Sequence, residues 1–403
     1  MKIIKKDGTV EGWNGEKIKE AVYKAAARVN QYVEPDILDK LVEKVHSCLI
    51  IDRDAPTKDL HKEVIHYLKY FGLTDVANSY QEYRDYKNTY AKSFEKVKDE
   101  ADNVLLLGDR ENANFDSSLV STKGSLIKGY LTKELYRQFY LSKEEKELTK
   151  RGDIYIHDMR DMLMGSVNCC LFDIGNVLRG GFSMSNVDYT EPTSVLSALQ
   201  VIGDITLVAT AQQFGGFSLS QLDMVLLPYC HKTLEKAYEH AKHSFPDEGR
   251  FAWIAYSKDT LKNELKQGFQ SLELKLNTVP CSRGDFAFTT ISFGCWNAPQ
   301  WLGRYLNDTD LWILKEICEA ILTTRMNGHG ENHKPVVFPK LVYLYEENYL
   351  SAFQEARDVF ELAIECSSKC MYPDFLSLTG DWAHSSVGKQ YMENKQVVTP
   401  MGA

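Results

Sequence analysis

Long apolar runs are missing from this sequence of 403 residues. Its longer apolar stretches, such as ITLVATA at 205–211, fall far short of the roughly 20 residues that a helix needs to cross a bilayer. The sequence opens with Met-Lys-Ile-Ile and shows no hydrophobic segment of a secretory signal peptide. We therefore predict a cytoplasmic protein without a membrane partner.

A surplus of positive charge is also missing. Lys and Arg number 47 against 56 Asp and Glu, which gives a formal net charge of −9. Binding along a nucleic-acid backbone needs a surplus of cations, so a general nucleic-acid partner is not expected. An acidic balance still allows small anionic ligands to bind where a few cations gather.

Paired cysteine motifs do not occur. The nine cysteines are an odd number at irregular spacing, and CSSKC at 366–370 has three residues between its cysteines rather than the two of a CxxC motif. We expect reduced thiols rather than a disulfide scaffold, and we predict no metal-ligating residue. Internal repeats and low-complexity tracts are absent too, and the length favours two or three folded domains.

The first 95 residues have the pattern of a small domain of their own. KIIKKDGTVEGW alternates around Asp7-Gly8, a dipeptide typical of tight hairpin turns. Asn14 then stands where the N-cap of a helix is expected. The apolar residues of this helix recur at helical spacing: Ile18, Val22, Ala25, Ala26 and Val29.

Three more helices are predicted in this domain, over 34–50, from Pro56 onward with Thr57 as the cap, and over about 74–94. The expected product is a small β cap on four helices. Residues 96–110 look like a charged connector that ends in a short apolar run.

The remaining sequence changes character from ENANFDSS at 111–118 onward. Short apolar segments alternate with helical ones, among them SVLSALQVIGDITLVATAQQ at 194–213 and DLWILKEICEAILTTRM at 310–326. Such alternation favours an α/β fold over a helical bundle. We therefore predict an α/β protein with a second domain over 96–403.

Basic residues gather around the predicted hairpin. Lys5 and Lys6 flank the Asp7-Gly8 turn, and Lys17 lies one turn into the first helix. Three cations beside a glycine turn and a helix N-terminus can cradle a triphosphate, because free N–H groups add to the side-chain charge. On spacing alone, solvated lysines on a small domain are the simpler interpretation.

The order of motifs favours nucleotide binding. IIKKDGTVEGWNGEKIKEAV, followed by DVANSYQEYRDYK, resembles the ATP-cone, a nucleotide-sensing domain at the N-termini of ribonucleotide reductases. The resemblance implies ATP and dATP as allosteric effectors. In that motif an Arg is commoner than a Lys at the position of Lys6. Lys6 keeps the positive charge but lacks the bidentate fork of an Arg. By position, these residues would contact the nucleotide: Lys5, Lys6, Glu11, Asn14, Lys17, Thr57 and, as a further candidate, Arg84.

A second dense stretch is RGDIYIHDMRDMLMGSVNCCLFD at 151–173. His157 is, by its residue type, more often a satisfied polar partner than a catalyst, and cysteines are among the most buried residues. Neighbouring cysteines on a strand face opposite ways, so only one of Cys169 and Cys170 can reach a given site.

Many segments of the chain together resemble the anaerobic (class III) ribonucleoside-triphosphate reductases. They come in that family's order and at roughly its spacing, over essentially the whole chain: ENANFDSS, RGDIYIHD, NCCLFD, RGGFSMSN, PTSVLSAL, QQFGG, SRGDFAFTTISFG, VVFPKLVY, ECSSKCMYPDFL and TPMG. SRGDFAFTT lines the barrel in that comparison, although it can equally be a purely structural strand.

The resemblance implies a ten-stranded α/β barrel of the glycyl-radical type and the reduction of ribonucleoside triphosphates to deoxyribonucleoside triphosphates. A glycyl radical passes to a loop cysteine, whose thiyl removes the ribose 3′ hydrogen, and a strand cysteine takes part in the reduction. Implied partners are deoxynucleotide effectors, a radical-SAM activating enzyme, a second copy in a homodimer and, in many members, formate as reductant. The glycyl radical and a four-cysteine zinc site are expected only in a C-terminal part.

Site residues follow from the same resemblance. The strand cysteine after Asn168 is Cys169, although the spacing from His157 also leaves Cys170 open. His157 and Asp158 match a segment that lines the substrate site. Three further candidates for that site precede them: Asn112, Asn114 and Ser117.

The family's loop cysteine follows Thr-Pro-Met-Gly, and here Ala403 follows Gly402. An alanine has no S–H bond, so this chain alone is predicted to be inactive, with the catalytic barrel incomplete. Three explanations remain open: a truncated chain with a Cys-to-Ala change, a chain break, or the N-terminal flank of an intein insertion.

Two other functions compete with a reductase. A nucleotide-sensing regulatory module is one, because ATP-cones also occur in a repressor of reductase genes; that repressor carries a zinc ribbon before its cone, and here no cysteine precedes Cys48. Another glycyl-radical enzyme, such as a formate lyase, is the other, but an ATP-cone is not expected there.

Overall fold

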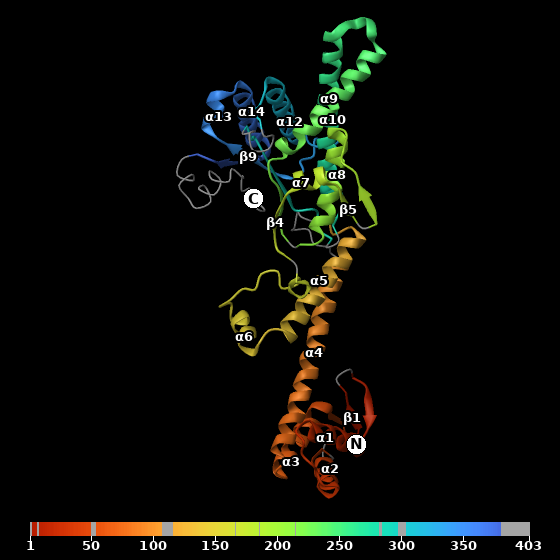
Figure 1. Ribbon diagram of the computed structural model, residues 1–403. Coiled ribbons are helices and arrows are strands. Elements are labelled where there is room, and N and C mark those ends of the chain that lie inside the picture. The colour runs from red at the N-terminus through yellow and green to blue at the C-terminus, as the bar shows by residue number, and fades with distance from the viewer. Residues whose placement is uncertain are drawn as a thin grey trace. The chain divides into compact units, whose positions relative to one another are not determined.

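The computed structural model describes residues 2–5, 8–49, 54–106, 116–165, 167–184, 186–213, 215–281, 284–296 and 304–379 (Figure 1). The chain divides into two units, Met1–Asp99 and Glu100–Ala403. None of the described helices is both long enough and apolar enough to span a membrane.

The first unit begins with the predicted hairpin. Strands β1 (Lys2–Ile4) and β2 (Val10–Gly12) pair antiparallel, and β3 (Asp54–Pro56) adds to β1 in parallel. The turn closes through a hydrogen bond from the Lys5 N–H to the Thr9 carbonyl at 2.8 Å. Gly8 has a φ of +81°, which a glycine adopts without strain. The hairpin is thereby confirmed, while Asp7 lies outside the described residues.

Four helices complete this unit: α1 (Gly15–Arg28), α2 (Pro35–Leu49), α3 (Thr57–Tyr70) and α4 (Thr74–Leu106). The Asn14 side chain caps α1 by accepting from the Glu16 N–H at 3.0 Å. The predicted apolar face is buried at Ile18, Val22, Ala25 and Ala26. Val29 is an exception, because α1 ends at Arg28 and leaves it 37% exposed.

Two predictions for this unit are wrong. Thr57 does not cap α3: it is the first helical residue, and its hydroxyl donates to the Ile4 carbonyl at 2.8 Å, tying the helix to β1. Residues 96–106 are not a connector but the last turns of α4. The segment EKVKDEADNVLL contains no Gly or Pro, so nothing in it stops a helix.

The second unit is built on a parallel sheet of five strands in the order β10-β9-β8-β7-β4. The strands are β4 (Cys170–Phe172), β7 (Phe217–Leu219), β8 (Thr289–Phe293), β9 (Lys340–Tyr345) and β10 (Asp374–Ser377). A separate hairpin joins β5 (Phe182–Met184) to β6 (Val187–Tyr189). The mixed α/β class is confirmed, and the closed ten-stranded barrel stays a prediction.

Helices supply the crossovers that parallel strands require. The crossovers contain α7 (Ile174–Gly180), α8 (Val195–Thr210), α9 (Leu222–Ser244), α10 (Gly249–Thr278), α12 (Asp308–Asn327), α13 (Glu347–Ala352) and α14 (Gln354–Cys370), with a short 3-10 turn at Pro246–Glu248. Two helices and a 3-10 turn precede the first strand of the sheet: α5 (Val120–Phe139), α6 (Lys143–Arg151) and Met162–Met164. Both predicted helical segments, 194–213 and 310–326, contain such a helix.

The core of the second unit surrounds the middle of this sheet. Every residue of β8 is buried, as expected of a central strand covered on both faces. Thr289 and Thr290 of the SRGDFAFTT motif are the first two residues of β8. That part of the motif is therefore a central, buried strand of the sheet.

A buried carboxylate organises the start of α12. Asp310 is fully buried, shares a capping box with Asn307, and binds the guanidinium of Arg304 and the His231 Nε2, the latter at 2.7 Å. Burial alone would raise the pKa of Asp310. The hydrogen bonds outweigh this effect and lower the pKa from 3.8 to about 2.

Candidate functional site

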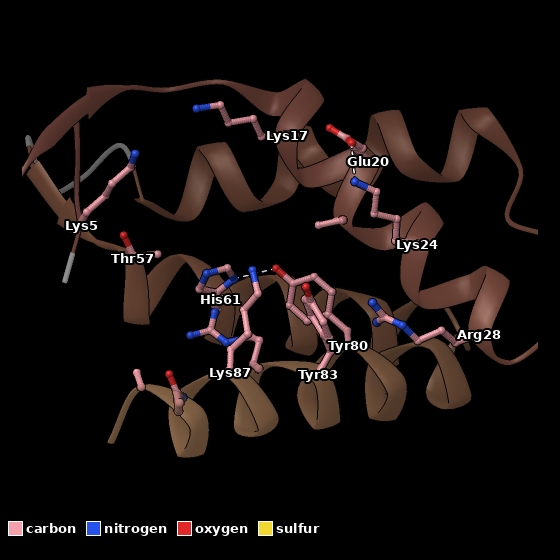
Figure 2. Close-up of a pocket in the computed structure, with 14 residues that line it drawn as sticks. Lys5, Lys17, Glu20, Lys24, Arg28, Thr57, His61, Tyr80, Tyr83 and Lys87 are labelled. Carbon is pink, nitrogen blue, oxygen red and sulfur yellow. Dashed lines mark hydrogen bonds and ion pairs between the residues drawn. The ribbon is translucent and has the colours of Figure 1, made fainter. Parts of the chain in front are cut away.

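The first unit contains a cavity of about 670 Å³ between α1, α3 and α4 (Figure 2). The buried Ser79 hydroxyl of α4 donates to the Ala25 carbonyl of α1 at 3.0 Å and so fixes two of its walls to each other. The cavity is lined by Lys5, Lys17, Glu20, Ala21, Lys24, Arg28, Thr57, His61, Tyr80, Tyr83, Arg84, Lys87, Asn88 and Ala91.

Helical spacing explains why these side chains share one space. The lining residues of α1 recur every three or four positions from Lys17 to Arg28, and those of α4 do the same from Tyr80 to Ala91. Side chains at such spacing lie on one face of a helix. Each helix thus turns a single polar face to the cavity.

Positive charge dominates the cavity. Six of its lining side chains are cationic and one is a carboxylate, Glu20. Glu20 is itself paired with Lys24 at 2.6 Å. The arrangement therefore suits a ligand that carries several negative charges.

The cations near the hairpin are held by a carboxylate beside the cavity. Glu11 binds Lys17 at 2.8 Å and also forms an ion pair with Lys5. The hydrogen bonds from Lys17 and then Lys5 lower the pKa of Glu11. The carboxylate thus stays ionised and keeps both ammonium groups close together.

Two tyrosine rings, Tyr80 and Tyr83, also line the cavity. The Arg28 guanidinium lies 4.1 Å and the Lys87 ammonium 5.0 Å from the centroid of the Tyr83 ring. The Tyr80 hydroxyl and the His61 Nδ1 are 2.6 Å apart. Burial raises the pKa of Tyr80, so its phenol stays neutral.

Arg84 offers the cavity a buried donor that suits an anionic ligand. Its Nη1 is buried and has no hydrogen-bond partner within the described part of the chain. Burial lowers the pKa of this guanidinium. A buried donor without a partner is costly, and a negatively charged ligand group would satisfy it.

The structure places the predicted nucleotide residues as follows. Lys5, Lys17, Thr57 and Arg84 line the cavity, Glu11 bridges two of its lysines, and Asn14 caps α1. Lys6 lies outside the described residues. The sequence interpretation missed these lining residues, although their spacing within each helix was a readable signal: Lys24, Arg28, His61, Tyr80, Tyr83 and Lys87.

The predicted strand cysteines lie in the second unit. Cys170 is the first residue of β4, at the edge of the sheet beside β7, and Cys169 comes immediately before it. Cys169 Sγ accepts from the Gly216 N–H at 3.2 Å, and Cys170 Sγ lies 2.9 Å from Gln213 Oε1. Burial, followed by the neighbouring Cys169, raises the pKa of Cys170.

The other predicted substrate residues are not brought to the cysteines by any described hydrogen bond or ion pair. His157 Nε2 pairs with Asp158 Oδ2 at 3.2 Å, and the His157 side chain is 71% exposed. Ser117 lies in the turn before α5. Asn112, Asn114 and Ala403 fall outside the described residues. Among the residues that the structure does describe, no group of three metal-ligating side chains could hold an ion.

Known proteins match both units. Residues 1–89 match the ATP cone domain, and residues 111–403 match the anaerobic ribonucleoside-triphosphate reductase family. The anaerobic ribonucleoside-triphosphate reductase of Salmonella typhimurium is 30% identical over 385 residues, covering 93% of this chain and 51% of that protein. The enzyme of the same name from Haemophilus influenzae is 31% identical over 389 residues, covering 93% and 52%.

Among solved structures, the anaerobic ribonucleotide reductase from Thermotoga maritima in complex with dATP and CTP is similar with a TM-score of 0.47 and 17% identity, over 74% of this chain and 50% of that one. The chain spans about half the length of the curated relatives it matches. Because the family match extends over residues 111–403, the chain belongs to the anaerobic ribonucleoside-triphosphate reductase family.

Proposed function

We propose that the chain forms the effector-binding domain and part of the substrate site of an enzyme that reduces ribonucleoside triphosphates to deoxyribonucleoside triphosphates. Its domains are an ATP-cone over 1–95 and a catalytic α/β domain over 96–403. ATP and dATP bind in the cone and set the activity of the catalytic domain.

The cationic cavity is the observation that carries this proposal. Its volume of about 670 Å³ is in the range of small-molecule sites, and a triphosphate supplies the charge that six cations and the unpaired Arg84 Nη1 require. Lys5, Lys17 and Arg84 are the phosphate-binding residues in this proposal. Thr57 adds a hydroxyl at the N-terminus of α3, where free backbone N–H groups favour an anion.

In the catalytic domain, Cys169 is the reducing cysteine, and His157, Asp158, Asn112, Asn114 and Ser117 belong to the ribonucleotide side of the site. Ala403 takes the position of the cysteine that would exchange a hydrogen atom with the ribose, and an alanine cannot do so. The full reaction would further use a glycyl radical introduced by a radical-SAM activating enzyme, formate as reductant and a homodimeric assembly.

Calorimetric titration of the chain with ATP and dATP tests the cone. One nucleotide-binding event that is lost when Lys17 and Arg84 are both replaced by Ala supports the cavity as the effector site. Unchanged binding in that double variant would contradict it, because the cavity would then not be the site.

The same double variant separates a reductase from a nucleotide-sensing regulatory module. The cavity is formed entirely by residues of the first unit, so a regulator needs no second nucleotide site. Deoxynucleoside triphosphates that still bind the double variant, through the second unit, would favour the reductase. Loss of all nucleotide binding would favour the regulatory module.

A further inference from the structure

The segment between α8 and β7 contains a buried amide, Gln213, whose side chain contacts Cys170 and the turn that hydrogen-bonds to Cys169. Gln213 is 3% exposed, and its backbone forms a parallel bridge with Val167, two residues before Cys169. Gln213 Nε2 lies 3.0 Å from the Gly215 carbonyl and 2.8 Å from the Gly216 carbonyl. Its Oε1 lies 2.9 Å from Cys170 Sγ.

The two carbonyls fix the orientation of this amide. A carbonyl oxygen can only accept, so the group facing Gly215 and Gly216 must be the NH₂ of Gln213. Oε1 is then left facing Cys170, and an amide oxygen can only accept as well. Cys170 must therefore donate its S–H to Gln213, which keeps it as a thiol.

The neighbouring sulfur has the opposite role. The Gly216 N–H donates to Cys169 Sγ at 3.2 Å, and within the described chain Cys169 has no acceptor for its own S–H. A Cβ on Gly215 would lie 2.5 Å from Cys169 Sγ and 3.0 Å from the Asn168 carbonyl, so the turn packs directly on this cysteine. Gln213 holds that turn through both of its N–H groups.

We propose that Gln213 is a positioning residue that decides which of the two adjacent sulfurs is available for chemistry. It engages the S–H of Cys170 and, through the Gly215-Gly216 turn, presents a backbone N–H to Cys169. Cys169 is therefore the sulfur whose hydrogen is free to be transferred, and Cys170 is held in a structural hydrogen bond. This inference rests on the proposed reductase function, because that function gives one of the sulfurs a chemical task.

Alkylation of the chain with iodoacetamide, with each modified sulfur assigned by fragmentation in a mass spectrometer, tests the inference. Cys169 should react about tenfold faster than Cys170, since a hydrogen bond of about 1.4 kcal/mol protects the latter. Replacing Gln213 by Leu keeps the size of the side chain and removes all three hydrogen bonds. Cys170 should then react about five- to tenfold faster than in the unmodified sequence, and the preference for Cys169 should nearly vanish.

Two controls separate positioning from a general loss of structure. Gln212→Leu changes the exposed neighbour in the same QQ pair and should leave both rates unchanged. Cys230 and Cys318 are fully buried, so they should stay unreactive in Gln213→Leu. The inference is overturned if Cys170 reacts as fast as Cys169 in the unmodified sequence, if Gln213→Leu leaves their ratio unchanged, or if the two buried cysteines become reactive with them.

Alkylation rates need neither nucleotide nor activating enzyme. A failed ATP titration would therefore count against the proposed function alone, and an unaltered sulfur ratio would count against the role of Gln213 alone.

Discussion

Replacing Arg84 by Met should weaken nucleotide binding and stabilise the ligand-free cone at the same time. Met keeps most of the length and the apolar stem of the side chain and removes the guanidinium. In the ligand-free cone the buried Nη1 has no described partner, so its removal relieves a desolvation cost of about 1–3 kcal/mol. In the complex the same change deletes a charge-assisted hydrogen bond to phosphate.

A hydrogen bond to a charged group contributes about 1.5–3 kcal/mol, which corresponds to a dissociation constant about 10- to 150-fold higher. Calorimetry with ATP measures that ratio. Hydrogen exchange of peptides from α1 to α3 measures the stability of the cone separately from that of the second unit, and these peptides should exchange more slowly in Arg84→Met.

Lys44→Met is the matched control. Lys44 is an exposed residue of α2 that does not line the cavity, and its replacement changes the net charge of the cone by the same amount. It should leave the ATP affinity within about twofold of the unmodified sequence. The reasoning is refuted if Arg84→Met binds ATP as tightly as this control, or if its cone exchanges faster than before.

Three further substitutions test other parts of the structure. Asp310→Asn should cost about 2 kcal/mol of unfolding free energy at pH 7, because the pKa of Asp310 is lowered from 3.8 to about 2. This stability is present above about pH 4, so in urea unfolding the difference should roughly halve by about pH 3 and disappear below about pH 2. Gly215→Ala should destabilise the protein by about 1–3 kcal/mol, because the added Cβ would clash with Cys169. Gly124→Ala, on α5 with nothing near the added Cβ, should instead stabilise it by about 0.5–1 kcal/mol. Thermal unfolding that gives both variants the same change in stability would contradict the close contact of Gly215 with Cys169. Asn14→Ala should lower the stability of the cone by about 1 kcal/mol because it removes the N-cap of α1, and Asn14→Asp should keep that stability because Asp also caps helices. If both variants lose ATP affinity without losing stability, Asn14 contacts the nucleotide instead of capping the helix.

Local chemistry was readable from the sequence where one residue decides it. Gly8 allowed the hairpin turn, Asn14 marked the start of α1, and the spacing of Ile18 and Val22 gave its buried face. These features depend on neighbours a few positions away, which is the range over which sequence patterns act.

The cavity was only partly readable because it depends on two helices meeting. Lys17 and Arg84 were predicted from the resemblance, but Lys87 and Tyr83 enter the site only because α4 packs against α1 through contacts such as Ser79 to Ala25. Each helix face was visible in the spacing, and the partner of each face was not.

The choice between the two adjacent cysteines stayed open at the sequence level for a similar reason. Alternation along a strand predicts that Cys169 and Cys170 point to opposite sides, but it does not say which side carries an acceptor. That information comes from Gln213 and Gly216, more than 40 positions later in the chain, which reach β4 only through the pairing with β7.

The ion pairs of Glu11 mean that Lys5 and Lys17 already have a negatively charged partner before any ligand binds. The Glu11 carboxylate neutralises part of the charge on Lys5 and Lys17, so an incoming anion must compete with this carboxylate for the two ammonium groups. Chloride or a single carboxylate carries no more negative charge than Glu11, so replacing Glu11 as the partner of these lysines gains little binding free energy. A polyphosphate brings several charges at once, so we expect the cavity to select ligands first by their number of negative charges and then by their shape.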